Sequence, residues 1–376
     1  MQLESGQILS GTLRLKKKIA QGGMGTVWIA HHLVLGTDVA VKIMASPWSS
    51  VPAARTRFLR EARMTAQIES PHVVRVLDCR FDEADEPYLV LELLHGEDLE
   101  QRVRRRGPLP LGDVVEIVAQ TCEALAACHD ANVVHRDMKP ENVFLVESDR
   151  TLVKILDFGV AKPLDPNACL DVDKLACGTP QYMSPEHMFE PSATDVRSDL
   201  FSLAAVAYFA LTGHTPFEAD TLEGLYLAID AGAFRPPSER RGELPRALDA
   251  WFDRALANAP DDRFQDARAM AAALYDVLRE ASADRLAAAG ETGTVRPSWI
   301  PTLADLEPTG LPRRRLRKLR RARGVEIGAI ALAVVTLVLV FRDGSAAVAS
   351  PEPAMVDAGP DGPPAVDQAF MCPSEE

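Results

Sequence analysis

The stretch His135-Arg136-Asp137-Met138-Lys139-Pro140-Glu141-Asn142 decides how the rest of this 376-residue chain is interpreted. It places a carboxylate, an ammonium group and a carboxamide at short spacings between two apolar runs, residues 132–134 and 143–146, both short enough to be strands. Asp157-Phe158-Gly159 follows a further apolar run, residues 152–156. Two strands flanking one loop, with two carboxyl groups and an amide between them, could hold a hard cation and phosphate oxygens.

Neither stretch is decisive alone, because an Asp-Phe-Gly tripeptide arises often by chance and a loop aspartate is usually a turn former. Together, in this order, they resemble the catalytic loop and the magnesium-binding triplet of eukaryotic-like protein kinases. The resemblance implies that Asp137 accepts the proton of the attacking hydroxyl and that Asn142 and Asp157 bind Mg²⁺. Lys139 corresponds to the lysine that contacts the transferred phosphoryl group, which favours Ser or Thr over Tyr as the residue phosphorylated.

A cluster of glycines near the N-terminus predicts a phosphate-binding turn between two strands. Gly22-Gly23-Met24-Gly25 precedes the alternating, β-prone run at residues 26–30. A plain hairpin turn would use the same residues, but glycines also let a backbone approach phosphate oxygens closely. The kinase pattern G-x-G-x-x-G-x-V maps onto residues 20–27, and Ala20 stands where the first glycine is usual. The resemblance therefore places the nucleotide against Ile19, Ala20, Gln21, Gly22, Gly23, Met24, Gly25, Thr26 and Val27.

Lys42 ends the strand-like run Val39-Ala40-Val41-Lys42, which resembles the strand that carries the phosphate-anchoring lysine. By itself such a lysine would be an exposed edge charge. Residues 55–69 read as a helix that places Glu61 where the family's ion-pair glutamate lies. If the two pair, Lys42 is held against the α- and β-phosphates of ATP.

Residues 88–94 form an apolar run that resembles the strand and hinge joining the two lobes of a kinase. Leu91 takes the position at the back of the adenine pocket. The resemblance directs backbone groups of Glu92 and Leu94 to the adenine edge. Residues 111–131 have helical periodicity and lead into the catalytic loop.

The segment from Asp157 to Glu186 departs from its relatives. Related bacterial kinases phosphorylate hydroxyl residues shortly before the Gly178-Thr179 pair, and the phosphate pairs with the arginine that precedes the catalytic aspartate, here Arg136. Between Val160 and Gly178 this chain has no Ser, Thr or Tyr. Our hypothesis is that Asp171 or Asp173 supplies fixed negative charge to Arg136; the alternative is that these are solvated loop carboxylates.

Later motifs complete the resemblance, which covers residues 9–280, about three quarters of the chain. Asp199 resembles the aspartate of the large buried helix that ties back to the catalytic loop, and Arg263 resembles the arginine that pairs with Glu186. The implied fold class is α+β: a two-lobed protein kinase fold with an antiparallel N-lobe sheet plus one helix and a helical C-lobe.

Beyond the kinase-like region, the composition predicts a flexible linker (281–312), a basic juxtamembrane segment (313–323), a transmembrane helix (325–341) and a short disordered tail (342–376). A 17-residue span reaches about 25 Å as a helix, the short end of what crosses a bilayer. A buried core helix is the alternative. Basic residues on its N-terminal flank place the kinase domain in the cytoplasm of a single-pass cell-membrane protein.

Composition limits the remaining functions. A net charge of −13 argues against general nucleic-acid binding, and the 47% of hydrophobic residues suffices for a sizeable core. The six cysteines lack metal-ligand spacing, so reduced thiols are favoured, although Cys372 in the tail leaves a homodimer open. Residues 1–10 lack the pattern of a signal peptide.

The sequence therefore predicts a membrane-anchored bacterial Ser/Thr protein kinase that uses ATP and Mg²⁺ to phosphorylate proteins. One alternative is a pseudokinase that acts as a membrane-tethered binding module, which Ala20 weakly favours. A second is a small-molecule phosphotransferase, which the Gly-Thr-Pro and Ser-Pro-Glu elements of a peptide-docking segment argue against.

Overall fold

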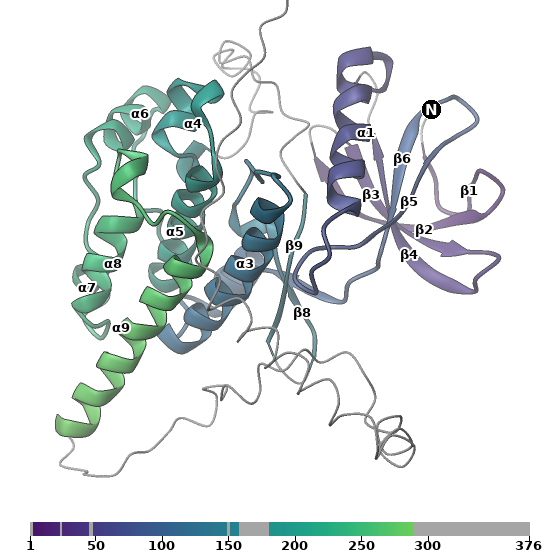
Figure 1. The fold of residues 1–376 in the computed structure, drawn as a ribbon. Coiled ribbons are helices and arrows are strands. Elements are labelled where there is room, and N and C mark those ends of the chain that lie inside the picture. Colours follow the sequence, from purple (N-terminus) through teal and green to yellow (C-terminus); the bar gives the residue numbers. More distant parts are fainter. Residues whose placement is uncertain (1–2, 23–24, 45–47, 149–150, 158–179, 289–376) are drawn as a thin grey trace, which may run out of the picture. The chain divides into compact units, whose positions relative to one another are not determined.

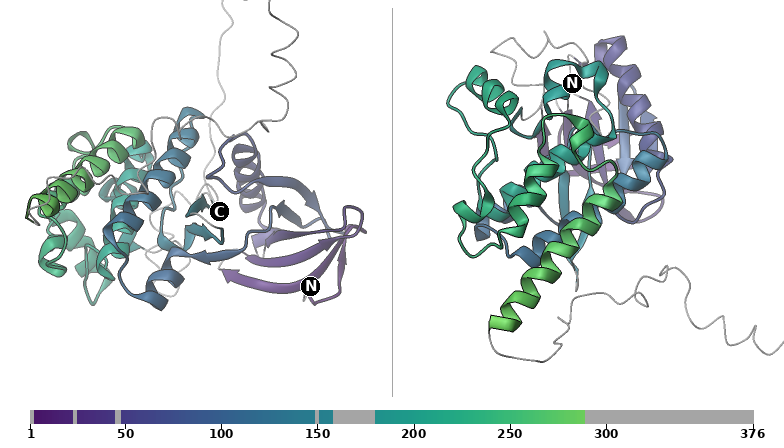
Figure 2. Two further views of the ribbon diagram at one scale, coloured as in Figure 1. Left: turned by 90° about the horizontal axis from the view of Figure 1, so that it is seen from below. Right: turned by 60° about the vertical axis from the view of Figure 1, so that its left-hand side comes forward.

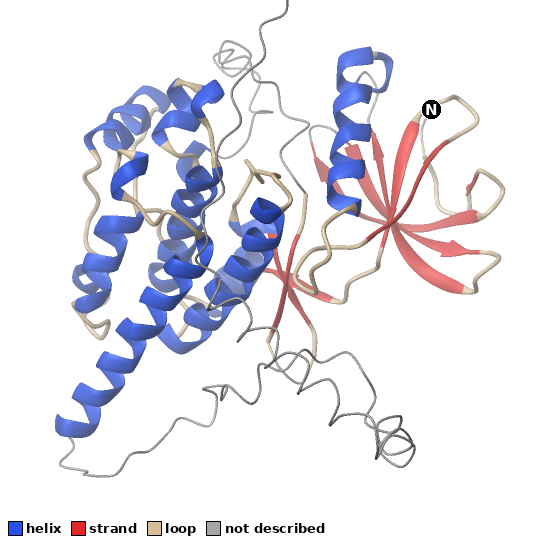
Figure 3. Cartoon of the chain, in the orientation of Figure 1, coloured by secondary structure: helices blue, strands red, loops and turns tan. Residues whose placement is uncertain are grey.

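The computed structural model of the chain describes residues 3–22, 25–44, 48–148, 151–157 and 180–288 (Figure 1). These residues form two lobes, one built on an antiparallel sheet with a single long helix and the other built of helices (Figure 3). A smaller three-stranded sheet lies beside the helical lobe, next to α3. This arrangement confirms the predicted two-lobed α+β fold.

The N-terminal lobe contains a six-stranded sheet in the order β1-β2-β3-β4-β6-β5, and every neighbouring pair is antiparallel. The strands are β1 (Ile8–Leu9), β2 (Leu13–Gly22), β3 (Gly25–His32), β4 (Thr37–Met44), β5 (Val76–Phe81) and β6 (Pro87–Leu91). The predicted order of strand, glycine turn and strand is present as β2 and β3. Gly25 has to be a glycine, because a Cβ there would lie 2.2 Å from the carbonyl oxygen of Ile43 on β4.

Strand β4 uses its two faces differently, since successive side chains of a strand point to opposite sides. Val41 packs into the core of the sheet on one face. Met44 packs on the other face, with Phe58 and Ala62 of the helix α1 (Pro52–Ala66). Lys42 shares the face of Met44, so the strand directs it towards α1.

Helix α1 buries Phe58, Glu61, Ala62 and Thr65, which lie on one stripe at helical spacing. Glu61 is therefore on the buried side of the helix. The helix begins and ends about one turn earlier than the predicted range of residues 55–69. Pro52 supplies a favourable first helical residue, and a second proline, Pro71, disfavours helix in the residue before it.

The three-stranded antiparallel sheet has the order β7-β8-β9 and consists of β7 (Gly96–Asp98), β8 (Val143–Val146) and β9 (Leu152–Ile155). Strands β8 and β9 confirm two of the predicted apolar strands. The prediction of a strand at residues 132–134 is wrong. Asn132 has a left-handed backbone with φ of 57°, and the amide of Val133 donates to Cys128, so these residues close the preceding helix instead.

The helical lobe is built around α5 (Val196–Thr212). The side chain of Asp195 accepts a hydrogen bond from Arg197 at its start, and the left-handed Gly213 ends it. Nearly every residue of α5 is buried. The other helices are α2 (Leu99–Arg106), α3 (Leu111–Asp130), α4 (Pro185–Phe189), α6 (Leu222–Ala231), α7 (Pro237–Arg240), α8 (Ala247–Ala255) and α9 (Ala267–Ala288). Figure 2 shows α9, in light green, along the outside of this lobe, where it packs against α3.

Short 3₁₀ turns connect these elements: η1 (Trp48–Ser50), η2 (Pro140–Asn142), η6 (Pro180–Tyr182), η7 (Pro191–Ala193) and η8 (Pro260–Asp262). Helix α9 continues to Ala288, so the range expected as a linker begins inside this helix. No helix in the described ranges is both long and apolar enough to cross a bilayer. The predicted span at 325–341, its flanks and the hypothesis on Asp171 and Asp173 all lie outside the described residues.

Candidate active site

Lys42 lies at the centre of a group of charges between the sheet and α1, in which Glu61 is buried and Asp157 is partly exposed. Its Nζ is 2.8 Å from Oδ1 of Asp157 and 3.5 Å from Oε1 of Glu61. Burial disfavours the ammonium form of Lys42, but the two carboxylates outweigh burial and raise its pKa. Burial also raises the pKa of Glu61 to about 7, which Lys42 only partly offsets because it is closer to Asp157.

A second group of polar side chains is built by the catalytic-loop stretch. Nδ2 of Asn142 donates to the carbonyl oxygen of Asp137 at 2.7 Å and to its carboxylate at 3.1 Å. Nζ of Lys139 lies 3.1 Å from the same carboxylate. Because the amide nitrogen of Asn142 faces Asp137, its amide oxygen is left to serve as a ligand.

Asp199 on α5 anchors the backbone of this loop by hydrogen bonds. One of its carboxylate oxygens accepts the backbone amide of Arg136 at 2.8 Å, and the other accepts the amide of His135 at 2.8 Å. Nε2 of His129 is 2.9 Å from the second oxygen. Burial raises the pKa of Asp199, but these hydrogen bonds and the nearby histidines lower it below its usual value. The bonds stabilise Arg136 in a left-handed conformation with φ of 64°.

The ring of His135 connects the two groups. Its Nδ1 accepts from the amide of Asp137 at 3.2 Å, and its Nε2 donates to the carbonyl of Leu156 at 2.9 Å. The amide of Leu156 donates back to Asn142 at 2.9 Å. One donor and one acceptor suit the neutral imidazole, and burial lowers the pKa of His135 accordingly. Asp157 follows directly, with φ of 40°.

The structure therefore brings together every predicted catalytic and metal-binding residue. Lys42, Glu61 and Asp157 form one contact group, and Asp137, Lys139 and Asn142 form the other. The Asp157 carboxylate and the Asn142 amide oxygen are the oxygen ligands that these groups would supply to a cation. This donor set fits Mg²⁺, which usually takes one or two protein ligands besides substrate phosphates and water. The described residues contain no group of three or more His, Cys, Asp or Glu side chains that could hold a metal ion.

The positions expected to bind adenine have suitable backbone groups. The backbone amide of Glu92 donates a hydrogen bond to the carbonyl oxygen of Arg75 at 3.0 Å. In the described part of the chain, neither the carbonyl of Glu92 nor the amide of Leu94 makes a hydrogen bond. Both groups remain available for a planar base.

The glycine-rich turn is only partly described, because Gly23 and Met24 fall outside it. Ala20, which replaces the usual first glycine, lies in β2 opposite Val27 and does not have a positive φ. The strand accepts an alanine there without backbone strain. A Cβ at Gly22 would meet nothing within 4 Å, so packing does not require that glycine. Close approach of a ligand to the backbone would require it.

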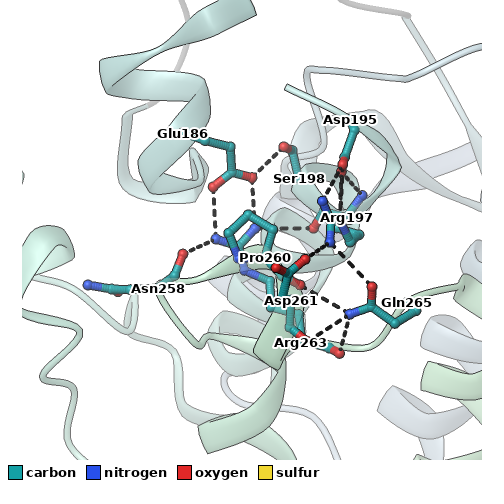
Figure 4. Close-up of polar contacts among 9 residues, drawn as sticks. All are labelled: Glu186, Asp195, Arg197, Ser198, Asn258, Pro260, Asp261, Arg263 and Gln265. Atoms are coloured by element: carbon teal, nitrogen blue, oxygen red, sulfur yellow. Dashed lines mark hydrogen bonds and ion pairs between the residues drawn. The ribbon is translucent and has the colours of Figure 1, made fainter. Parts of the chain in front are cut away.

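A buried ion pair within the helical lobe joins Arg263 to Glu186 of α4 (Figure 4). Arg263 has a fully buried side chain and binds both carboxylate oxygens of Glu186, at 2.7 and 2.8 Å. Its remaining N–H groups donate to the backbone carbonyls of Arg197, Ala257 and Asn258. Burial opposes ionisation of Glu186, but Arg263 and Ser198 lower the pKa of Glu186 to about 2. The pairing predicted for Arg263 and Glu186 is confirmed.

Sequence patterns missed three supporting residues. His129, His72 and Lys154 all make contacts between distant segments. Nζ of Lys154 on β9 binds the carboxylate of Glu92 at 2.7 Å and thereby ties the hinge to the smaller sheet. The sequence around Lys154 is typical of an exposed lysine on a strand, and no local motif indicates its contact with Glu92.

The protein kinase domain family matches residues 13–273 of this chain. The serine/threonine-protein kinase PknH of Mycobacterium bovis is 34% identical over 318 residues, which cover 80% of this chain and 52% of PknH. Serine/threonine-protein kinase Pkn1 of Myxococcus xanthus is 36% identical over 272 residues, covering 72% of this chain and 39% of Pkn1. The chain thus spans about half or less of the length of these relatives.

Solved structures resemble the same region. The kinase domain of Mycobacterium tuberculosis PknI, as a C20A/R136A double mutant, superposes with a TM-score of 0.60 at 26% identity, covering 74% of this chain and 99% of that one. Rad53 in complex with AMP-PNP gives a TM-score of 0.58 at 26% identity, over 69% of this chain and 64% of Rad53. Protein kinases use ATP and Mg²⁺, the ligands that the two groups of charges suit. By its matched region and by these relatives, the chain belongs to the protein kinase family.

Proposed function

We propose that this protein transfers the γ-phosphoryl group of Mg-ATP to Ser or Thr hydroxyls of proteins. The observation that supports this most strongly is the convergence of Lys42 on Asp157, at 2.8 Å, beside a catalytic loop in which Asn142 and Lys139 both contact Asp137. These contacts group the charged side chains to which the proposed phosphoryl transfer assigns roles. The names of the similar proteins, serine/threonine-protein kinases, agree with the assignment.

In the proposed reaction Asp137 orients the substrate hydroxyl and takes up its proton as the new oxygen–phosphorus bond forms and the bond from the γ-phosphorus to the bridging oxygen breaks, which releases ADP. Lys139, 3.1 Å from that carboxylate, is placed to offset negative charge on the transferred group. Lys42 would turn from Asp157 towards the α- and β-phosphate oxygens while Glu61 fixes its direction. Asn142 and Asp157 would hold Mg²⁺, which neutralises charge on the phosphates when bound. Positioning and charge neutralisation supply most of the rate.

The test is transfer of labelled γ-phosphate from Mg-ATP to a generic protein substrate, followed by identification of the phosphorylated amino acid. We expect labelled phosphoserine or phosphothreonine from the wild-type chain and a loss of about 10²-fold or more in Asp137→Ala. Asp130→Ala is the matched control, because Asp130 forms only an exposed ion pair with Arg268. Nucleotide binding with transfer no greater than in Asp137→Ala would instead identify a pseudokinase that acts as a binding module.

We also propose that the chain is anchored in the cell membrane by residues 325–341, with the kinase domain in the cytoplasm. The apolar run and the eight basic residues within positions 313–323 support this proposal. Full-length protein should stay in the membrane pellet after alkaline extraction. Replacing Val334 and Val338 by Asp should release it, because a charge at the centre of a span costs about 3 kcal/mol, whereas Val334→Leu should not. Wild-type protein in the soluble fraction would contradict the proposal.

A homodimer is the remaining proposal, supported by a single cysteine, Cys372, in the tail beyond the apolar run. Tails on the outer side of a membrane meet oxidising conditions, in which such a thiol forms an intermolecular disulfide. Non-reducing electrophoresis should show a dimer that disappears in Cys372→Ser. Monomer in both samples would exclude this disulfide.

A further inference from the structure

His72 lies in the connection between α1 and β5, where its side chain is buried against the helical lobe. Its Nδ1 is 2.9 Å from the carbonyl oxygen of Val153 on β9. Its Nε2 is 3.2 Å from Oε2 of Glu123 on α3. One ring therefore bridges an N-lobe connection, the smaller sheet and a C-lobe helix.

Both partners of His72 are acceptors. A carbonyl oxygen cannot donate a hydrogen bond, and an ionised carboxylate cannot either. A neutral imidazole carries a single N–H, so it can satisfy one of the two contacts but not both. Only the doubly protonated imidazolium donates to Val153 and Glu123 together. His135 provides the contrast, because the amide of Asp137 donates to one of its ring nitrogens.

The place of His72 in the chain makes its charge relevant to the active site. Its backbone carbonyl accepts the amide of Ile155 at 2.8 Å, and the amide of Val74 donates to the carbonyl of Ile155 at 3.1 Å. Nζ of Lys154 donates to the carbonyl of Val73 at 3.2 Å. Residues 72–74 are thus bonded along β9, which ends two residues before Asp157.

The same connection follows α1, which carries Glu61. Its attachment to β9 therefore helps to set the relative position of Glu61 and Asp157, the two carboxylates that share Lys42. We propose that protonated His72 is a positioning residue: a cationic tie between this connection and the helical lobe that holds Glu61 and Asp157 in register around Lys42, and that loosens when the ring loses a proton. The effect on catalysis rests on the proposed kinase activity, whereas the charge of the ring does not.

The charged and titratable groups around the ring agree with this assignment. Burial lowers the pKa of His72, but Glu123 and the Val153 carbonyl outweigh it and raise that pKa above the usual value, against the opposing charge of Lys154 on β9. Tyr275 on α9 interacts electrostatically with Glu123, and burial raises the pKa of this tyrosine to about 12. The Glu123 side chain is 62% exposed, so solvent screens its attraction.

The sign of the pH dependence follows from the raised pKa. The tie is complete below the ordinary histidine pKa of about 6.5 and is lost as pH rises through the higher value in the folded protein. Activity that depends on the tie should therefore decline on the alkaline side. We expect a decline of about two- to fivefold, the range typical of an ion pair with one exposed partner.

The first test measures the ring directly. Spectra of the full chain labelled with ¹⁵N-histidine at both ring nitrogens should contain, among the eight histidines, one that is doubly protonated at pH 6.5 and that loses its proton only at higher pH. This signal should be absent in His72→Asn, which assigns it. A His72 ring that is neutral at pH 6.5 would overturn the proposal, whether or not the protein transfers phosphate.

The second test asks whether the charge acts on the site. Glu123→Gln offers an amide N–H to Nε2, so a neutral His72 can make both contacts. The ratio of wild-type to Glu123→Gln in kcat/KM for ATP should fall two- to fivefold from pH 6.5 to 9, while Glu116→Gln on the same helix, whose carboxylate contacts Gln120, follows the wild type. Parallel profiles in all three would overturn the positioning role.

Calorimetric titration with Mg-ATP provides the same comparison as an affinity ratio. It separates failure of this proposal from failure of the proposed activity, because nucleotide affinity does not require transfer. If the affinity ratio changes with pH in the expected direction and no variant transfers phosphate, the tie is supported and the proposed activity is contradicted.

Discussion

The ion pair of Arg263 and the ion pairs of Lys42 are built in opposite ways. Arg263 uses all five N–H groups on oxygen acceptors and packs its guanidinium over the ring of Phe201, 4.9 Å away. Lys42 divides its charge between Glu61 at 3.5 Å and Asp157 at 2.8 Å, and the side chain of Asp157 is 46% exposed. Every N–H group of Arg263 is already hydrogen-bonded, so this pair has no donor left for another ligand. The second keeps donor capacity that an incoming phosphate group can use.

The two glutamates record the same contrast. The pKa of Glu186 is lowered to about 2, because paired N–H donors compensate its burial. The pKa of Glu61 is raised to about 7, because burial outweighs the single ammonium group of Lys42, 3.5 Å away. A fully compensated charge stabilises the fold, whereas an undercompensated one leaves the site able to rearrange. The following changes test that distinction.

The largest effect should come from Arg263→Leu, which leaves Glu186 buried without a partner. We expect the free energy of unfolding to fall by about 3–5 kcal/mol in denaturant titrations. Arg268→Leu breaks an exposed pair with Asp130 and should cost no more than about 1 kcal/mol. Equal losses in the two variants would mean that saturation of Arg263 has no energetic value.

Lys42→Met should affect chemistry rather than folding. Removal of one preorganised charge from phosphoryl transfer should lower kcat/KM for ATP by about 10²–10³-fold. Glu61 can then take up a proton, so the free energy of unfolding at pH 6.5 should change much less than in Arg263→Leu. A loss of stability as large as that of Arg263→Leu would show that the two pairs do not differ in kind.

The pH dependence should separate Glu61 from Glu186. Because the pKa of Glu61 is raised above the ordinary 4.5, its contribution to stability is complete below 4.5 and is lost as pH rises through about 7. The pKa of Glu186 is lowered, so its contribution is present above 4.5 and is lost as pH falls through about 2. The free energy of unfolding should be measured from pH 2 to 8. Glu61→Gln should remove its fall between about pH 4.5 and 7, and Glu186→Gln should remove its fall below pH 4.5. A variant that removed the opposite fall would reverse the assignment.

The smallest effect should come from Ser198→Ala. Its buried hydroxyl donates to Glu186, and the loss of a hydrogen bond to a charged group should cost about 1.5 kcal/mol in thermal or chemical unfolding. Ser282→Ala removes only a bond to the helix's own backbone and should cost less than about 0.5 kcal/mol. If the two substitutions cost the same, Ser198 adds nothing to the compensation of Glu186.

The sequence predicted the parts of the site that consist of short, chemically distinctive motifs. Asp137, Asn142 and Asp157 stand at fixed spacings, and the helical stripe of α1 brings Glu61 to Lys42. The roles assigned to these residues remain predictions that the kinetic tests address.

The errors and omissions arise where distant contacts decide the structure. Val133 and Val134 are apolar and β-prone, yet hydrogen bonds to the end of α3 hold the preceding Asn132 in a left-handed conformation. His72 contacts Glu123 and Val153 across some fifty and eighty residues of chain. No local pattern encodes such a contact, because its partners lie on elements whose packing is fixed only by the whole fold.

Helix α5 is buried around nearly its whole circumference, and Asp199 projects from it to the backbone of the catalytic loop. A close-packed helix has no free direction in which to slide, because any shift would open voids and overlap neighbours at once. We therefore expect α5 and the catalytic loop bound to it to keep their positions when a nucleotide binds. The six-stranded sheet that carries Lys42 would then move as a rigid body to adjust to the nucleotide.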